Sequence, residues 1–343
     1  MSSSRYFQSA RNPVFFIAEV GGNHEGAEGT LRELHRLALT SGADAVKYQL
    51  YRGDTLVSRV EGTDRNAHFK RFELPLEVYG DLADMCRDAG VDFMASTWDL
   101  EWIEWADARS RMHKVGSGDL TAFPLIRRLV QTGKPIILST GLATLADVDA
   151  AVDYVSTLDR RYLDDKKLAI LQCTSAYPCP DADANLLSME TLRQRFGLPV
   201  GFSDHTEGSV AIEAAVALGA EIIEKHFTDT REGKTFRDHK VSLTAEEVRE
   251  SLARMTRIVA MRGHTEKVPT AAELASGHVV SFRRSVYAAR PLAAGTVLGE
   301  DDLTVLRPAH GIAASRFSDV VGRVLRTAKG THDVLHDEDL VGG

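Results

Sequence analysis

Two histidines stand near the ends of two apolar segments, and each has a polar residue two positions before it. The pairs are Ser203 with His205 and Glu224 with His226. Side chains two residues apart on a strand share a face, so each pair can point into one site. Neutral imidazole nitrogens bind divalent cations well, so the pattern predicts an open metal site at His205 and His226. Asp238 follows shortly afterwards and could orient a water molecule or the histidines.

Lysines, carboxylates and hydroxyl groups end the other apolar segments. Lys47, with Gln49 two positions later, and Lys114 bring positive charge, and Glu19 brings a carboxylate. Ammonium and hydroxyl groups together suit a small anion that carries phosphate or carboxylate. A Schiff-base lysine is the competing interpretation, although an imine-forming aldolase does not need the histidine pair. The hydroxyl-bearing residues at segment ends are Thr97, Ser117, Ser139, Ser175, Tyr177 and Ser203.

The elements that would position these residues are short apolar segments alternating with helix-compatible stretches. Several helix-like stretches end at a glycine just before the next apolar segment, namely at Gly42, Gly90, Gly133, Gly197 and Gly219. Glycine suits the left-handed residue that closes a helix. Eight strands alternating with helices over about 250 residues predict an α/β fold of the (β/α)₈ TIM-barrel type, whose chemistry sits at the carboxyl ends of the strands. A doubly wound open sheet is the alternative, but the chain lacks its usual phosphate-binding loops.

The pattern changes towards the end of the chain. We predict a catalytic barrel domain over 1–262, a linker over 263–281 and a small β-rich domain over 282–343, where short strand-like runs alternate with Pro and Gly turns. A domain of about 60 residues is marginally stable alone. We therefore expect it to dock onto a barrel, either its own or that of a second subunit.

Composition excludes several functions. The 343 residues include 41 Lys and Arg against 49 Asp and Glu, a net charge of −8 that attracts neither nucleic acid nor an anionic membrane. No apolar run approaches the roughly 18 residues needed to span a bilayer. The three cysteines, Cys86, Cys173 and Cys179, support neither a disulfide framework nor a zinc ribbon. We expect a cytoplasmic protein with reduced thiols.

Motifs along almost the whole chain resemble the sialic acid synthase family. They are IAEVGGNHEG at 17–26, GADAVKYQ at 42–49, KVGSGDL at 114–120, ILSTG at 137–141, CTSAYPCP at 173–180, GFSDHT at 201–206, EKHFT at 224–228 and DHKVSL at 238–243. The stretch 283–312 is similar to the family's antifreeze-protein-like (SAF) domain. The family condenses phosphoenolpyruvate with an N-acylated amino sugar aldehyde, such as N-acetylmannosamine, to give a nine-carbon 2-keto sugar acid.

The resemblance implies a role for each site residue. His205 and His226 would hold a divalent cation, usually Mn²⁺, with Mg²⁺ or Co²⁺ as the other choices. Glu19 and Asp238 match the acidic groups that position water and the sugar, and Arg307 matches an arginine that reaches the acceptor from the partner in a domain-swapped homodimer. The residues matching the lining of the two substrate pockets are Lys47, Gln49, Thr97, Lys114, Ser117, Ser139, Ser175, Tyr177, Ser203 and Glu224.

The acceptor is the open point of this interpretation. Ala309 and His310 depart from the family pattern beside Arg307, in the region expected to read the acyl group. The alternatives are a synthase with the same mechanism and an atypical aldehyde, or a metal-dependent keto-acid aldolase. A sugar-binding protein without turnover is disfavoured because Glu19 and Lys47 are present together with the histidine pair.

Overall fold

A closed barrel of eight parallel strands forms the first part of the computed structural model, which describes residues 4–341. The order around the barrel follows the sequence, and β1 closes it by pairing with β8. The predicted TIM barrel is therefore confirmed. The strands are β1 (Phe15–Glu19), β2 (Ala45–Leu50), β3 (Asp92–Thr97), β4 (His113–Val115), β5 (Ile136–Ser139), β6 (Leu168–Cys173), β7 (Val200–Asp204) and β8 (Ile222–His226).

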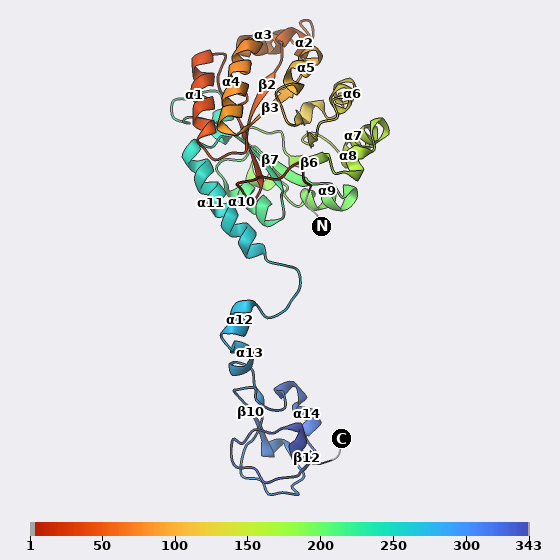
Figure 1. The fold of residues 1–343 in the computed structure, drawn as a ribbon, viewed down its shortest axis with the longest axis vertical. Helices are drawn as coiled ribbons and strands as arrows, with labels where there is room; N and C mark the ends of the chain where they lie inside the picture. Colours follow the sequence, from red (N-terminus) through yellow and green to blue (C-terminus); the bar gives the residue numbers. More distant parts are fainter. Residues whose placement is uncertain (1–3, 342–343) are drawn as a thin grey trace. The chain divides into compact units, whose positions relative to one another are not determined.

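Helices follow the strands and surround the barrel (Figure 1). Gly90 closes α4 in the left-handed conformation, with φ of +66°, as the glycine pattern predicts. The connection after β2 is longer than the others and contains two additional helices, α2 (Gly53–Leu56) and α3 (Thr63–Phe72). The remaining helices of the barrel unit are α1 (Glu28–Leu39), α4 (Leu76–Ala89), α5 (Ile103–Asp107), α6 (Phe123–Gln131), α7 (Leu145–Leu158), α8 (Arg161–Asp164), α9 (Ser188–Phe196), α10 (Val210–Ala217) and α11 (Ala245–Arg262).

The alternation of side chains along each strand builds two separate cores. Outward-facing residues such as Val46, Tyr48 and Phe202 join the large core between the strands and the helices. Inward-facing residues fill the barrel itself, and these are Phe15, Ile17, Ala45, Met94, Met112, Ile137, Ala169, Leu171 and Ile222, joined by Phe7. Parallel strands buried on both faces explain why each apolar run in the sequence is nearly continuous.

The chain divides into two compact units between Gly263 and His264. The second unit has a core of its own, which includes Val286, Leu298 and Leu325. Its elements are α12 (Ala271–Ala275), α13 (His278–Ser281), β9 (Ser285–Ala288), β10 (Leu303–Leu306), α14 (Phe317–Val320), β11 (Val324–Leu325) and β12 (Leu340–Val341), with β9 antiparallel to β10 and β11 antiparallel to β12. The stretch 263–281, predicted as a linker, thus contains two short helices.

Among residues 4–341, every helix is too short or too polar to cross a lipid bilayer.

Candidate active site

Four charged side chains of alternating sign form a chain across the carboxyl end of the barrel. Lys47 Nζ lies 2.8 Å from Glu19 Oε2 and 3.6 Å from Glu224 Oε2. Lys114 Nζ lies 3.5 Å from the other carboxylate oxygen of Glu224. All four side chains are buried, although they come from β1, β2, β4 and β8. A buried charge is costly unless it is paired, and here each charge has at least one opposite neighbour.

The pKa of each carboxyl in this chain depends on how many ammonium groups face it. Burial opposes ionisation of Glu224, but Lys114 and Lys47 together outweigh burial and lower its pKa to about 2. Burial raises the pKa of Glu19 above its ordinary value, and Lys47 offsets only part of that effect. Burial likewise lowers the pKa of Lys114. The two ammonium groups therefore favour the ionised form of Glu224, whereas burial favours the protonated form of Glu19.

One predicted hydroxyl contacts this chain of charges, and two others meet at Gly141. Ser203 Oγ donates a hydrogen bond to Glu224 Oε1 at 2.9 Å. The Gly141 amide donates to Ser117 Oγ at 3.0 Å, and a Cβ at Gly141 would collide with Ser175 Oγ. The hydroxyls of Ser117 and Ser175 thus converge on a backbone position where only glycine fits.

Two further predicted hydroxyls have no partner in the structure. Thr97 Oγ1 and Ser139 Oγ are buried, and neither forms a hydrogen bond within the part of the chain that the structure describes. Buried polar groups are normally hydrogen-bonded. Gln49, also predicted, donates a hydrogen bond from Nε2 to Glu19 Oε1 at 3.1 Å.

The two histidines lie side by side at the ends of β7 and β8. Their ring centroids are 5.4 Å apart, and the Tyr177 ring lies 4.1 Å from that of His205, tilted by 39°. His205 Nδ1 is 2.8 Å from the Thr174 carbonyl oxygen, which can only accept a hydrogen bond, so this nitrogen carries a proton. Burial, with the neighbouring His205, lowers the pKa of His226 well below its ordinary value.

These residues fit a divalent cation. The Nδ1 atom of His226 is buried without a hydrogen bond and lies 3.9 Å from Asp238 Oδ2, and a neutral imidazole is the form that binds metals. No group of three or more His, Cys, Asp or Glu side chains among residues 4–341 is arranged around one metal position. His205 and His226 would accordingly supply two ligands and leave the rest to water and substrate.

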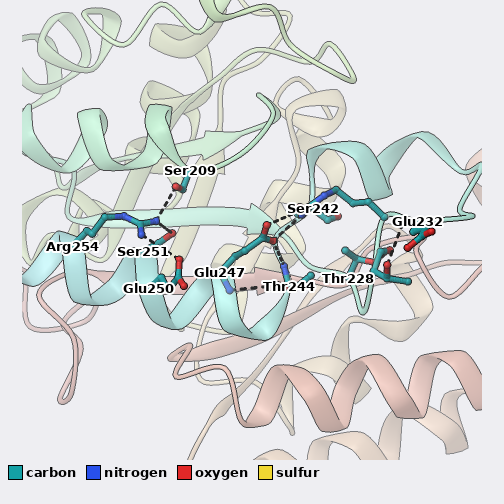
Figure 2. Close-up of polar contacts among 11 residues, drawn as sticks. Ser209, Thr228, Glu232, Ser242, Thr244, Glu247, Glu250, Ser251 and Arg254 are labelled. Atoms are coloured by element: carbon teal, nitrogen blue, oxygen red, sulfur yellow. Dashed lines mark hydrogen bonds and ion pairs between the residues drawn. The ribbon is translucent and has the colours of Figure 1, made fainter.

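Asp238 is held at the site by an anchored loop. It lies in a short 3₁₀ helix, Arg237–Val241, between β8 and α11. Arg231 of this loop donates to the Ser242 carbonyl at 2.9 Å and to Glu247 at 2.7 Å. Glu247 also accepts a hydrogen bond from the Thr244 amide, as Figure 2 shows. The loop is thereby fastened to the first turn of α11. Burial raises the pKa of Asp238 above its ordinary value.

Comparison with known proteins assigns the family. The sequence profile of the NeuB family matches residues 34–267, and the profile of the SAF domain matches residues 283–341. The chain belongs to the NeuB family. The predicted relationship to sialic acid synthases and the predicted SAF domain are therefore confirmed.

Relatives of this NeuB-family protein include synthases of three different sugar acids. It is 36% identical to an N,N'-diacetyllegionaminic acid synthase from Legionella pneumophila, over 90% of this chain and 89% of the relative. It is 30% identical to a pseudaminic acid synthase from Helicobacter pylori, over 91% and 93%. The crystal structure of an N-acetylneuraminic acid synthetase from Leptospira borgpetersenii has a TM-score of 0.71 at 28% identity, covering 78% of this chain and 92% of that one. These likenesses support an enzyme of the sugar acid synthase class.

Arg307 is the one predicted site residue that lies in the second unit of the NeuB-family chain. It follows β10, and its guanidinium lies 5.5 Å from the centroid of the Phe282 ring. Phe282 in turn stacks on His278 at 4.2 Å. The part of Arg307 in acceptor binding stays a prediction.

Two residues near the site were not predicted from the sequence. Arg237, whose side chain is 65% exposed, lies 4.6 Å from the Tyr177 ring and 3.3 Å from Asp238 Oδ1. Cys173 Sγ lies 3.8 Å from His205 Nδ1 and lines a cavity of about 420 Å³ together with Ser175. Cys173 ends a predicted strand, so the strand-end rule could have found it. No sequence signal marked Arg237.

Proposed function

We propose that the protein condenses phosphoenolpyruvate with an N-acylated amino sugar aldehyde to give a nonulosonic acid, and that it releases phosphate by cleavage of the C–O bond. The observation that carries this proposal is the alternating chain of Glu19, Lys47, Glu224 and Lys114 beside a pair of adjacent histidines. Such a site offers groups that bind an anion, a carboxylate whose ionised form two ammonium groups favour, and two imidazoles that could hold a Lewis acid. It belongs to a transferase of the enolpyruvate-condensing type.

The anionic groups of phosphoenolpyruvate would bind to the ammonium and hydroxyl groups. Lys47 and Lys114 are already held by Glu224, so their positions are fixed before the substrate arrives. Preorganised donors of this kind need little rearrangement when charge moves during the reaction. The hydroxyl groups available for the same anion are those of Thr97, Ser117, Ser139 and Ser175.

The histidines would hold the metal ion that activates the aldehyde. A divalent cation held by His205 and His226, with Mn²⁺ the first choice and Mg²⁺ or Co²⁺ the others, would supply a Lewis acid that polarises the aldehyde oxygen. The contacts of His205 with Tyr177 and with the Thr174 carbonyl fix its ring orientation and its tautomer.

Carboxylates would stabilise the positive charge that the reaction creates and accept the proton that the attacking water loses. Attack of the enol carbon on the aldehyde carbon leaves a cationic centre at the carbon that bears the phosphate oxygen. Glu224, ionised because its pKa is about 2, stabilises that centre. Water then adds there and loses its proton to Glu19 or Asp238, whose raised pKa values make them better bases than ordinary carboxylates. In the tetrahedral intermediate the C–O bond to phosphate then breaks as the new hydroxyl becomes the keto group and its proton leaves with the phosphate. The alkoxide formed from the aldehyde takes up the proton held by the carboxylate base.

The experiment that tests this function measures phosphate release from phosphoenolpyruvate after chelation, with Mn²⁺ restored and amino sugar aldehydes offered one at a time. Release that requires both Mn²⁺ and one aldehyde would support the synthase and name its acceptor. Metal-dependent cleavage of a keto acid without phosphate release would instead indicate an aldolase. No turnover in either assay would contradict both.

We further propose a cytoplasmic, domain-swapped homodimer in which Arg307 of one subunit reaches the acceptor in the other. The small size of the second unit and its separate core support this arrangement. An Arg307→Ala variant is expected to raise the acceptor KM without changing the KM for phosphoenolpyruvate, and light scattering should show two chains per particle. A monomer with full activity would contradict the arrangement.

A further inference from the structure

A buried ion pair lies directly behind the two histidines. Lys225 immediately precedes His226 in β8, and Asp204 immediately precedes His205 at the end of β7. Lys225 Nζ is 2.5 Å from Asp204 Oδ2, and both side chains are 0% exposed. Successive residues of a strand point to opposite faces. The histidines therefore face the mouth, whereas the ion pair faces the layer between strands and helices.

The ion pair also forms hydrogen bonds with Thr206, the residue that follows His205. Lys225 Nζ donates to the Thr206 carbonyl at 2.6 Å. Asp204 accepts from the Thr206 amide at 2.8 Å and from the Thr206 hydroxyl at 3.1 Å. The residues before and after His205 are thus tied to each other and to the residue before His226.

Stability alone does not account for these two charges. A fully buried ion pair loses its hydration, and apolar residues of similar volume are often as stabilising or more so. The neighbouring outward positions of the same strands, Phe202 and Ile223, are apolar and pack in the outer core. Unlike apolar residues, the ion pair forms directional hydrogen bonds. These bonds hold the ends of β7 and β8 in a fixed position relative to each other.

We propose that Lys225 and Asp204 are positioning residues that set the spacing and ring orientation of His205 and His226, and hence the affinity of the pair for a divalent cation. This inference rests on the proposed function, because it assigns a metal to the histidines. Neither residue touches substrate or metal; each acts through the histidine next to it.

The test uses two variants of the full chain. Lys225→Met removes the ammonium and leaves Asp204 as a buried, unpaired carboxylate. The double variant Asp204→Asn with Lys225→Met removes both charges and keeps a side-chain carbonyl for Thr206. Calorimetric titration with Mn²⁺ alone is expected to show a Kd raised about 10- to 100-fold in the double variant, the range typical of groups that orient metal ligands.

A second readout needs no metal. The ring resonances of His205 and His226, assigned in metal-free protein with the corresponding alanine variants, should shift in the double variant. Lys134→Met is the matched control. Lys134 stands just before β5, at the opposite end of the barrel, where its ammonium donates to the carbonyl oxygens of Asp107 and Ser110. This control should leave both the Mn²⁺ Kd and the ring resonances unchanged.

The outcomes separate this inference from the proposed function. A double variant with wild-type Mn²⁺ affinity and unshifted ring resonances overturns it, as does one that fails to fold, because the pair would then serve stability. Equal effects from Lys134→Met would also overturn it. If the wild-type protein binds Mn²⁺ at the histidines but releases no phosphate with any aldehyde, the proposed function fails and the positioning role stands.

Discussion

The inner wall of the barrel consists of two layers that share the same strands and differ sharply in chemistry. In the layer towards the amino ends the inward positions are apolar, and two residues further along the same face they become polar. Ile17 is followed by Glu19, Ala45 by Lys47, Met94 by Ser96, Met112 by Lys114, Ile137 by Ser139, and Ile222 by Glu224.

This difference shows how one barrel can be both stable and chemically active. Burying apolar side chains stabilises the fold, whereas burying charged ones costs free energy that only pairing offsets. The apolar layer therefore holds the strands together, and the polar layer above it can be arranged for chemistry. Substitutions in the two layers should consequently affect different measurements.

The largest expected effect comes from the polar layer. His226→Ala should lower kcat/KM by at least about 10³-fold, or about 4 kcal/mol, because one of two proposed metal ligands is lost. The unfolding transition should move little, because no core side chain is removed. Steady-state phosphate release and thermal unfolding measure the two quantities. Retention of full activity would remove the metal from the proposed mechanism.

The matching change in the apolar layer should have the opposite signature. Leu171→Ala is expected to lower the free energy of unfolding by about 3 kcal/mol, because it leaves a cavity in the barrel core. The folded fraction should keep nearly normal kcat. Val210→Ala is the control, since Val210 is 79% exposed and its truncation should change stability little. If Leu171→Ala reduced kcat as strongly as stability, the two layers would not be separable.

Asp238→Asn sharpens the comparison within the polar layer. We expect kcat to fall about 10²-fold if Asp238 is the base. A base must be deprotonated to act. Because burial raises the pKa of Asp238, activity should begin to fall at a higher pH than it would with a carboxyl of ordinary pKa. The variant should lose that acid limb of the profile. An unchanged limb would assign the proton transfer to Glu19.

The smallest effect is expected at the loop anchor outside both layers. The Arg231 hydrogen bond lowers the pKa of Glu247 to about 2 from its usual 4.5. A lowered pKa contributes stability above pH 4.5 that is lost as pH falls towards 2. Glu247 is 35% exposed, so Glu247→Gln should cost less than about 1 kcal/mol at pH 7 and only a small fraction of that at pH 2. Denaturation at the two pH values measures this, and an equal loss at both would refute the ion pair as its cause.

Much of the fold could be predicted because it depends on local patterns. Glycines such as Gly90 end helices, and apolar runs mark strands wherever they occur, so the eight strands are readable without a structure. The position of Ser203, His205, Glu224 and His226 on inward faces follows from the same two-residue period.

The partners of these residues could not be predicted. That Lys47 lies between Glu19 and Glu224 depends on barrel closure, because β1 pairs with both β2 and β8. The period of a strand gives the face of a side chain but not its neighbour on another strand. Arg237 was missed for a related reason, since its contact with Tyr177 joins two loops.

The sequence by itself therefore determined the barrel, the polar rim and the choice of groups that carry charge. Only the tertiary structure decided which charges neutralise one another, and so in which direction the pKa of each carboxyl moves. The reason is physical. Strand and helix formation depend on residues near in sequence, whereas electrostatic energies depend on distances between residues that only the closed barrel brings together.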